Sequence, residues 1–361
     1  MLNQIDQTAP WGQVDELAPT GFFADAYQFF QGVSHKVGGA LNKFYNLHGH
    51  LIRLSFAGPA LTKITPALEH WEVAPEGAPP ELTVCLWDDI STNTNMPPPP
   101  WLGYWAYTRR GEVRGYNTDR IRTAFQMGSD VLNILDLQRG LALYWTRDAT
   151  HLPQWELGSP LRIIFHWWLR QAGLQYVHAG AVGRPEAGVL LVGKGGSGKS
   201  TTSLTCLNSE LKYVSDDYCL ISTDPVAAAH NLYNTGKVRV DNIHRVPHLK
   251  PFISNMDKLD QDKALFSLNN QHFSDKLSPG FPLKALFIPR VTGRLETSLS
   301  PARAADGLSA LTLSTMAQLP GAGPAALQII NQLVQQIPSY FLELGTDLSQ
   351  IPVVILDFLT S

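Results

Sequence analysis

One run of eight residues near the middle of the chain constrains the fold more than any other feature: it reads Gly193, Lys194, Gly195, Gly196, Ser197, Gly198, Lys199, Ser200. The run fits the pattern G-x-x-x-x-G-K-S, in which glycines let the backbone wrap around phosphate oxygens and point successive N–H groups at them. An apolar segment, residues 189–192, precedes the run, and a segment of helical character, residues 199–207, follows it. This order of strand, loop and helix predicts a phosphate-binding loop.

The side chains at the end of this loop indicate which ligand it binds. We expect Lys199 to reach the β- and γ-phosphates and the Ser200 hydroxyl to ligate Mg²⁺, with Thr201 adding to the phosphate-binding start of the helix. The N-terminus of that helix adds its partial positive charge. The sequence therefore predicts ATP and Mg²⁺ as cofactors.

The same run also satisfies a second pattern, G-x-G-x-x-G, which is typical of dinucleotide-binding folds. Its glycines are Gly193, Gly195 and Gly198, and acidic residues follow about twenty positions later. Lys199 and Ser200 argue against this interpretation. A dinucleotide-binding helix has no need of a lysine directly after the last glycine, whereas the β- and γ-oxygens of a triphosphate do.

Two adjacent acids, Asp216 and Asp217, follow the loop inside the apolar segment 212–221. Acids in such a setting are costly to bury unless a metal, a cation or a proton compensates them. A metal-bound nucleotide would compensate them. We assign Asp217, with Ser200, to the metal and Asp216 to the base that accepts a proton from an attacking hydroxyl, although the residue pattern leaves their order open.

A histidine lies on the expected strand just before the loop strand. His178 stands in the apolar segment 174–182. A lone histidine in an apolar strand is usually a satisfied core residue. The residue pattern alone therefore leaves His178 open between a core position and a site position.

The chain divides into two differently composed halves. All nine tryptophans lie in the first 168 of its 361 residues, and the second half alternates expected strands and helices. Alternation of this kind predicts an α/β layered fold. We expect residues 1–160 to form a β-rich, Trp-rich domain that recognises the substrate and residues 161–361 to form the domain that contains the loop.

Short apolar runs and helical periodicity give the expected elements. Strands are expected at residues 51–56, 82–87, 104–107, 113–116, 131–135 and 141–145 in the first half, the last four forming two hairpins. In the second half they are expected at residues 174–182, 188–192, 213–221, 284–289 and 340–344. Helices are expected at residues 160–173, 199–207, 307–318, 325–336 and 348–359.

Charge, cysteine content and hydropathy argue against several classes of protein. A net charge of −3 offers no electrostatic footprint for nucleic acid or an anionic membrane. Three scattered cysteines suit a reducing cytoplasm rather than a disulfide framework. Residues 1–6 lack the basic and apolar regions of a signal peptide, and no stretch approaches the ~20 apolar residues of a membrane helix. We expect a cytoplasmic protein, and a homo-oligomer stays open.

The order of these motifs resembles the catalytic domain of HPr serine kinase/phosphorylases, which share a nucleotide-binding core with phosphoenolpyruvate carboxykinases. The matching pieces are His178-Ala179-Gly180, the loop 193–200, and Asp216-Asp217 on the strand after one short helix. This resemblance covers mainly residues 174–225. It implies a phosphoenolpyruvate-carboxykinase-like P-loop core, use of ATP and Mg²⁺, phosphorylation of a serine hydroxyl on a protein or peptide, and a site role for His178 near the γ-phosphate.

Two departures from that family narrow the expectation. The signature Glu-x-Arg-Gly-x-Gly, which the bifunctional enzymes carry after the acidic pair, is missing from residues 231–241, so phosphorylase activity does not follow. The first half does not resemble the family's N-terminal domain, so HPr as substrate does not follow either. The chain looks more like the stand-alone kinases of this superfamily that are encoded beside peptide-modifying enzymes, for which a peptide serine is the acceptor.

We therefore expect an ATP-dependent serine kinase acting on a peptide or small protein. A small-molecule kinase on the same core and a non-catalytic ATP-binding regulatory module are the alternatives. Phosphoryl transfer usually needs extra positive charge on the migrating group. Lys237 and Arg290 are the candidates for such a phosphate clamp.

Overall fold

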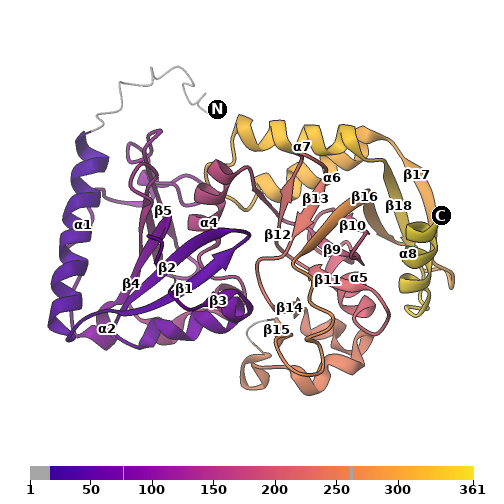
Figure 1. Cartoon of the computed structure of the whole chain (residues 1–361), viewed down its shortest axis with the longest axis horizontal. Coiled ribbons are helices and arrows are strands. Elements are labelled where there is room, and N and C mark those ends of the chain that lie inside the picture. Colours follow the sequence, from indigo (N-terminus) through magenta and orange to yellow (C-terminus); the bar gives the residue numbers. More distant parts are fainter. Residues whose placement is uncertain (1–16, 76, 261–262) are drawn as a thin grey trace, which may run out of the picture.

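The computed structural model describes residues 17–361 apart from residue 76 and residues 261–262. Residues 1–6, where the sequence lacks the features of a signal peptide, lie outside the described residues. Two large β-sheets, each with its own helices, lie next to each other (Figure 1). Within the described part of the chain, no helix is both long enough and apolar enough to cross a membrane.

The first half forms a mixed seven-stranded sheet in the order β3-β1-β2-β4-β7-β6-β5. The strand β4 pairs in parallel with both β2 and β7, and the other pairings are antiparallel. The bounds are β1 (Leu41–Leu47), β2 (His50–Ala57), β3 (Glu72–Val73), β4 (Leu82–Asp88), β5 (Ile121–Gln126), β6 (Val131–Asp136) and β7 (Leu141–Thr146).

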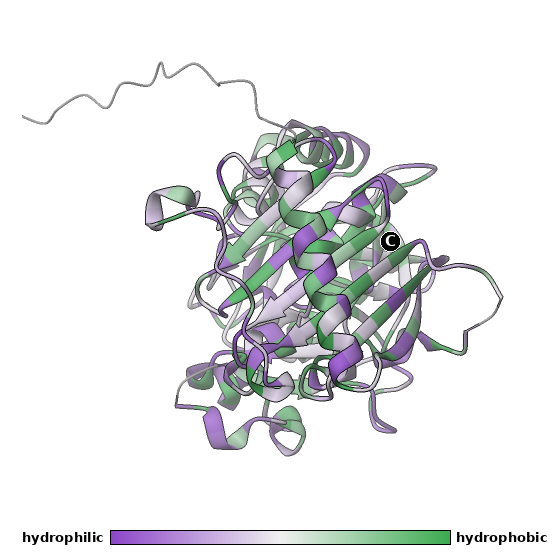
Figure 2. Cartoon of the chain, turned by 90° about the vertical axis from the view of Figure 1, so that its left-hand side faces the viewer, coloured by the Kyte–Doolittle hydropathy of each residue, from purple (hydrophilic) through white to green (hydrophobic). Residues whose placement is uncertain are grey.

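Helices cover both faces of this sheet. The helix α1 (Leu17–Lys36) buries Phe23 and Phe30 in the same apolar cluster as Trp87 of β4. Figure 2 faces α1 and shows hydrophobic and hydrophilic residues mixed along it, as expected for a helix with one buried side. The other face packs against η1 (Ala60–Trp71) and α4 (Arg162–Leu169). Short elements between strands are α2 (Asp89–Thr92), η2 (Tyr104–Ala106), η3 (Ala149–His151) and α3 (Gln154–Leu157).

The expectations for this half hold in part. The strands at residues 51–56 and 82–87 and the hairpin of residues 131–145 are confirmed. The hairpin expected at residues 104–116 is confirmed only at its turn, where an antiparallel bridge joins Tyr107 to Val113 and Thr108 N–H donates to the carbonyl of Glu112. The strand expected before the turn is absent, because residues 104–106 form a 3₁₀ turn. The Asn117 side-chain amide donates to the carbonyls of both Val113 and Thr123, which replaces strand pairing at this point.

A short helical segment connects the two halves. The helix expected at residues 160–173 is confirmed as α4 followed by η4 (Arg170–Ala172). It starts later than expected because Leu161 has a φ of 58°, which a helix cannot continue through. Buried residues of α4 belong to one apolar cluster that includes Leu54 of the first sheet and Leu220 of the second. The two halves therefore share a hydrophobic core.

The second half is a nine-stranded sheet in the order β11-β9-β10-β16-β13-β12-β8, with β17 and β18 added beside β16. The bounds are β8 (Gln175–Val177), β9 (Gly180–Arg184), β10 (Ala187–Leu191), β11 (Lys212–Ser215), β12 (Cys219–Ser222), β13 (Ala228–His230), β16 (Gly280–Val291), β17 (Ser298–Ala302) and β18 (Ser339–Leu344). A separate two-stranded sheet joins β14 (Thr235–Val238) to β15 (Ala264–Ser267). The 3₁₀ turns η5 (Val240–Arg245), η6 (Pro247–Phe252) and η7 (Met256–Lys258) lie between β14 and β15.

Two strands that the sequence predicts as continuous are each broken in the structure. The segment 174–182 divides into β8 and β9, and the segment 213–221 divides into β11 and β12. The two segments run antiparallel along each other, with Val177 opposite Cys219 before the break and Ala181 opposite Ser215 after it. The prediction missed the breaks because both segments are apolar on either side of them. His178 and Asp217 lie within these breaks.

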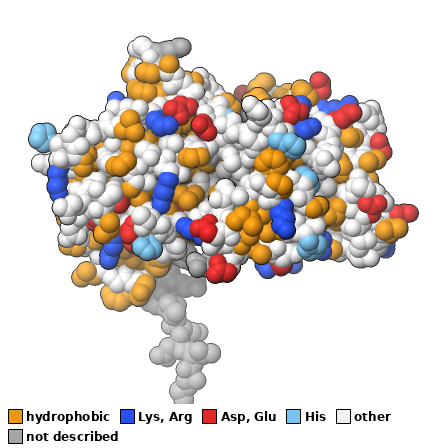
Figure 3. Space-filling model, turned by 90° about the horizontal axis from the view of Figure 1, so that it is seen from below, with side chains coloured by type: hydrophobic (Ala, Val, Ile, Leu, Met, Phe, Trp, Pro, Cys, Tyr) orange, Lys and Arg blue, Asp and Glu red, His pale blue; other side chains and the backbone are white. Residues whose placement is uncertain are grey.

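Helices cover the two faces of the second sheet, so the expected α/β layers are present. One face is covered by α6 (Ala304–Met316) and α7 (Pro324–Gln336). The other face is covered by α5 (Lys199–Cys206) and α8 (Gln350–Thr360). Successive residues of the central strand β16 point to opposite faces of the sheet. Leu286 packs in the apolar cluster under α6 and α7, and Phe287 packs in the cluster under α5 and α8. On the face of the molecule seen from below, acidic and basic side chains are interspersed (Figure 3).

Candidate functional site

A cavity of about 680 Å³ opens at the N-terminus of α5. Residues of the predicted loop form one wall, namely Gly195, Gly196, Gly198, Lys199, Ser200, Thr201 and Thr202. An apolar wall consists of Val291, Leu344, Gly345, Leu348 and Ile351. The wall opposite consists of Trp155, Arg162, Lys237, Val238, Arg239, Asn242, Arg245 and Lys263, and the floor contains His178, Asp217, Tyr218 and Gln318.

The loop has the backbone that its glycines predict. Gly198, the residue before α5, has a φ of 106°, and a Cβ there would approach the Leu344 side chain to 2.7 Å. A side chain at this position would be strained and would push into the apolar wall. Gly195 and Gly196 have no neighbouring atom within 4 Å of a Cβ position, so the space beside the loop is open to a ligand.

Lys199 lies across the loop rather than in solvent. Its ammonium donates to the carbonyl of Gly193 at 2.6 Å and to that of Lys194 at 3.2 Å. Burial lowers the pKa of Lys199 to about 8. An anion in the cavity would meet a desolvated cation and the loop N–H groups together.

The residues of this wall fit the triphosphate group that the motif implies. Thr202 lines the cavity, and its hydroxyl is buried without a hydrogen-bond partner in the described structure. The Ser200 hydroxyl donates to the backbone carbonyl of Asp216 at 3.3 Å, which puts a hydroxyl and a carboxylate residue side by side. Among the described residues, no group of three or more His, Cys, Asp and Glu could hold a metal alone. A Mg²⁺ ion here would depend on phosphate oxygens and water for its other ligands.

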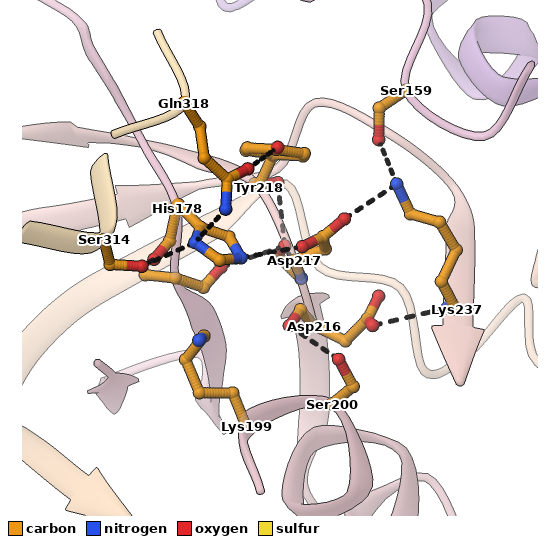
Figure 4. Close-up of polar contacts among 12 residues, drawn as sticks. Ser159, His178, Lys199, Ser200, Asp216, Asp217, Tyr218, Lys237, Ser314 and Gln318 are labelled. Carbon is orange, nitrogen blue, oxygen red and sulfur yellow. Dashed lines mark hydrogen bonds and ion pairs between the residues drawn. The ribbon is translucent and has the colours of Figure 1, made fainter. Parts of the chain in front are cut away.

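Asp217 lies on the cavity floor between two nitrogen donors (Figure 4). The His178 Nε2 atom is 2.9 Å from one carboxylate oxygen, and the Lys237 ammonium is 2.8 Å from the other. Burial alone would raise the pKa of Asp217, but the charges of Lys237 and the hydrogen bond from His178 hold it well below its usual range. Asp217 is therefore an ionised carboxylate that faces the cavity.

Asp216 has an environment that differs from that of Asp217. Asp216 does not line the cavity. One of its carboxylate oxygens accepts from the Tyr213 hydroxyl at 2.8 Å, and the other accepts from the backbone N–H of Lys237 at 3.3 Å. Burial and the nearby charge of Asp217 raise the pKa of Asp216 to about 6. The assignment of the base to Asp216 does not fit this geometry, because its carboxylate has no access to an acceptor. Asp216 is instead the acid that lies next to Ser200.

A hydrogen-bond relay fixes the orientation of His178. Its Nδ1 atom accepts from the Gln318 amide at 3.0 Å and also contacts the Ser314 hydroxyl. Gln318 in turn accepts from the Tyr218 hydroxyl, which assigns its amide nitrogen to His178. Burial lowers the pKa of His178, so the neutral ring with its proton on Nε2 is favoured, and that proton points at Asp217. The sequence analysis missed Ser314 and Gln318, although their i, i+4 spacing at the end of an expected helix put them on one face.

Of the two expected phosphate-clamp residues, one lies in the cavity and one does not. Lys237, on β14, is buried and bonds to Asp217 and, at 2.7 Å, to the Ser159 hydroxyl from the segment that connects the halves. Arg290 is half exposed on β16, with its guanidinium 3.2 Å from the centre of the Phe341 ring and 3.8 Å from Glu343. Arg290 is not among the residues that line the cavity, so the structure gives no support to its expected role at the phosphates.

Comparisons with known proteins give little beyond this geometry. No protein-family model matches the chain, and no curated protein matches it. Among solved structures, the HPr(Ser) kinase/phosphatase from Coxiella burnetii is similar over 51% of this chain and 95% of that chain, with 10% identity and a TM-score of 0.29. A likeness at this TM-score adds no argument to those from the cavity itself.

Proposed function

We propose that the chain is an ATP-dependent phosphotransferase that moves the γ-phosphoryl group to a serine hydroxyl of a peptide or small protein. The observation that carries this proposal is the position of Asp217. It is a half-buried, ionised carboxylate, held by His178 and Lys237, on the floor of the same cavity that the phosphate loop lines. A carboxylate in this position can accept the proton of a hydroxyl that attacks a phosphate.

The loop wall supports the nucleotide part of this proposal. The backbone N–H groups at the start of α5 and the Lys199 ammonium would bind the β- and γ-phosphates, where they also stabilise charge that develops on transfer. The Ser200 hydroxyl, which lines the cavity, would help to hold Mg²⁺, which supplies positive charge to the phosphate oxygens. The expected role of Asp217 as a metal ligand stays a prediction.

The floor supports the transfer part. The proton on His178 Nε2 and the Lys237 ammonium orient the carboxylate of Asp217, each bonding one of its oxygens. The hydroxyl of the acceptor would lie against Asp217 and lose its proton to it as the new oxygen–phosphorus bond forms. Lys237 also brings positive charge to the side of the cavity opposite the loop, where the migrating group has to be received.

The test is transfer of γ-labelled phosphate from MgATP into the peptide and small-protein fraction of a cell lysate. We expect label in a discrete peptide or protein with the wild-type chain. We expect a loss of at least about 100-fold with Asp217→Asn, because general-base catalysis contributes roughly that much. Asp357→Asn, a change at an exposed acid of α8, is the matched control and should leave transfer unchanged.

Three other outcomes would count against the proposal. Label confined to small metabolites would replace the peptide acceptor with a small-molecule acceptor. Tight MgATP binding without any transfer would favour a non-catalytic ATP-binding module. Full transfer by Asp217→Asn would remove Asp217 from the reaction and leave only the nucleotide site.

A further inference from the structure

We propose that the acceptor carries its own negative charge beside the reacting hydroxyl, as in a serine flanked by aspartate or glutamate, and that Arg162 and Arg245 bind that charge. This inference rests on the proposed function and names the substrate class of the same cavity. Nothing in the phosphate-loop motif requires it. It follows from how the cavity wall opposite the loop is built.

The cavity separates into an apolar end and a cationic end. Val291, Leu344 and Ile351 form the apolar end, and Leu344 also packs against Gly198 of the loop. An apolar surface adjoining the phosphate site suits the nucleoside part of ATP. The cationic end lies across the cavity, and Lys237 links it to Asp217. A hydroxyl that reaches Asp217 therefore brings its neighbouring groups to the cationic end.

The positive charge at this end exceeds what the protein itself neutralises. Lys237 is paired with Asp217 at 2.8 Å, and Arg239 is paired with Asp241 at 3.1 Å. Arg245 is exposed, lines the cavity and forms no ion pair with a residue in the described part of the chain. Among the described residues that line the cavity, Asp217 is the only acid.

Arg162 adds a second, deeper cation to the same end. Its guanidinium lies 4.6 Å from the centre of the Trp155 ring, and its Nε atom is buried without a hydrogen-bond partner in the described structure. A buried guanidinium donor without a partner is costly unless a ligand supplies an acceptor. Glu156, whose charge acts on Arg162, accepts from Tyr144 at 3.1 Å and forms no ion pair with Arg162 in the described part of the chain; burial raises the pKa of Glu156, and the Arg162 charge opposes that shift.

Lys263 increases the charge that faces the nucleotide side. Burial is the main cause of the lowered pKa of Lys199, and repulsion from the Lys263 ammonium lowers that pKa further. Arg162 and Arg245 therefore bring positive charge to the cavity that contains Asp217. A basic peptide would be repelled there and an acidic peptide would be attracted.

The experiment compares three synthetic peptides that place one serine between two aspartates, two asparagines or two lysines. Transfer of phosphate from MgATP and kcat/KM are measured for the wild-type chain, Arg162→Gln, Arg245→Gln and the control Arg184→Gln. Arg184 pairs with Glu210 at 2.9 Å on β9 and does not line the cavity. Binding of MgATP alone is measured in parallel for each variant.

We expect the wild-type chain to prefer the aspartate peptide over the asparagine peptide by about tenfold or more, and the lysine peptide to be the poorest acceptor. Arg245→Gln should reduce that preference severalfold through KM while MgATP binding is unchanged, and Arg184→Gln should keep it. Because Arg162 is partly buried, its variant also requires a folding check, and Arg245→Gln keeps the test decisive if that variant fails to fold.

Equal transfer to the aspartate and asparagine peptides, or an Arg245→Gln variant with the wild-type preference, would overturn the inference and leave the phosphotransferase intact. Transfer to none of the three peptides, with MgATP still bound, would overturn the peptide kinase itself. A wild-type preference for a small phosphorylated alcohol over every peptide would support an acceptor that carries negative charge, but it would overturn the assignment of that acceptor as a peptide.

Discussion

The two opposite walls of the cavity are built in contrasting ways. The loop wall comes from one continuous segment, residues 193–202, and presents mainly backbone N–H groups and one lysine. The wall opposite comes from three stretches of the chain and presents side chains; Trp155 and Arg162 belong to the first, Lys237 to Arg245 to the second, and Lys263 to the third. The proposed phosphate site is thus encoded locally, whereas the proposed acceptor site depends on tertiary structure.

This difference has an energetic side. Backbone N–H groups keep their direction whatever side chains surround them, so the loop wall depends on few residues. The wall opposite depends on buried ion pairs such as Lys237–Asp217, in which the loss of one partner strands the other. Variants of the two walls should therefore fail in different ways, which the following predictions use.

The largest effect is expected for Lys199→Met in the loop wall. The variant should lose at least about 1,000-fold in turnover, since it removes the desolvated cation that would meet the transferring phosphate. The free energy of unfolding should change little, because an apolar side chain of similar length replaces the buried lysine. Titration calorimetry with MgATP and a turnover assay measure this. Lys250→Met, at an exposed lysine of η6, should be indistinguishable from the wild type.

A smaller but structural effect is expected for Asp217→Asn in the floor. The change leaves the Lys237 ammonium buried without its carboxylate and should reduce the free energy of unfolding by about 3 kcal/mol. The double variant Asp217→Asn/Lys237→Met should recover part of that loss, since it removes the stranded charge. Urea denaturation of Asp217→Asn, Lys237→Met and the double variant gives the coupling free energy between the two side chains. Strictly additive losses would contradict a buried ion pair at this position.

The smallest effect is a pH dependence at the joint between the two sheets. Burial lowers the pKa of His70 and of His230 to about 4 and that of His166 to about 3, against 6.5 in the unfolded chain. Because the folded state favours the neutral rings, their contribution is complete above pH 6.5 and is lost as the pH falls toward 4. At pH 5.5 each histidine should cost about 1 kcal/mol of stability.

Thermal unfolding between pH 7.5 and 5.0 measures this dependence. The variant His166→Phe removes one of the three groups and should show a smaller fall in melting temperature over the same range. His151→Gln, at an exposed histidine, should follow the wild-type curve. A wild-type melting temperature that is flat down to pH 5 would contradict protonation of these rings on unfolding.

The sequence predicted the parts of the site that depend on neighbours along the chain. The loop, its helix, His178 and the acidic pair all come from one stretch of residues whose motif spacing is recognisable. Gln318 and Arg162 were missed, because each meets the site across long sequence separations and neither belongs to a local pattern. Arg290 was expected at the phosphates but does not line the cavity; it stacks on Phe341, a contact that depends on the pairing of β16 with β18.

The fold shows the same limit. Apolar runs located most strands, but they predicted residues 174–182 and 213–221 as continuous, whereas both are interrupted where His178 and Asp217 lie. Hydropathy reports burial and does not report a break in pairing between two buried pieces. The order of Asp216 and Asp217 likewise required the contacts of Tyr213, which hold Asp216 away from the cavity.

The apolar cluster that α4 shares with both sheets limits how this molecule can be dissected or recombined. A fragment that begins at residue 161 would keep the phosphate loop but lose Trp155 and Ser159 from the site and uncover Phe165 and Trp168. Such a fragment should aggregate rather than act as a smaller enzyme. Grafting a new first half onto this loop would thus mean redesigning the joint, and substrate preference would have to change together with folding.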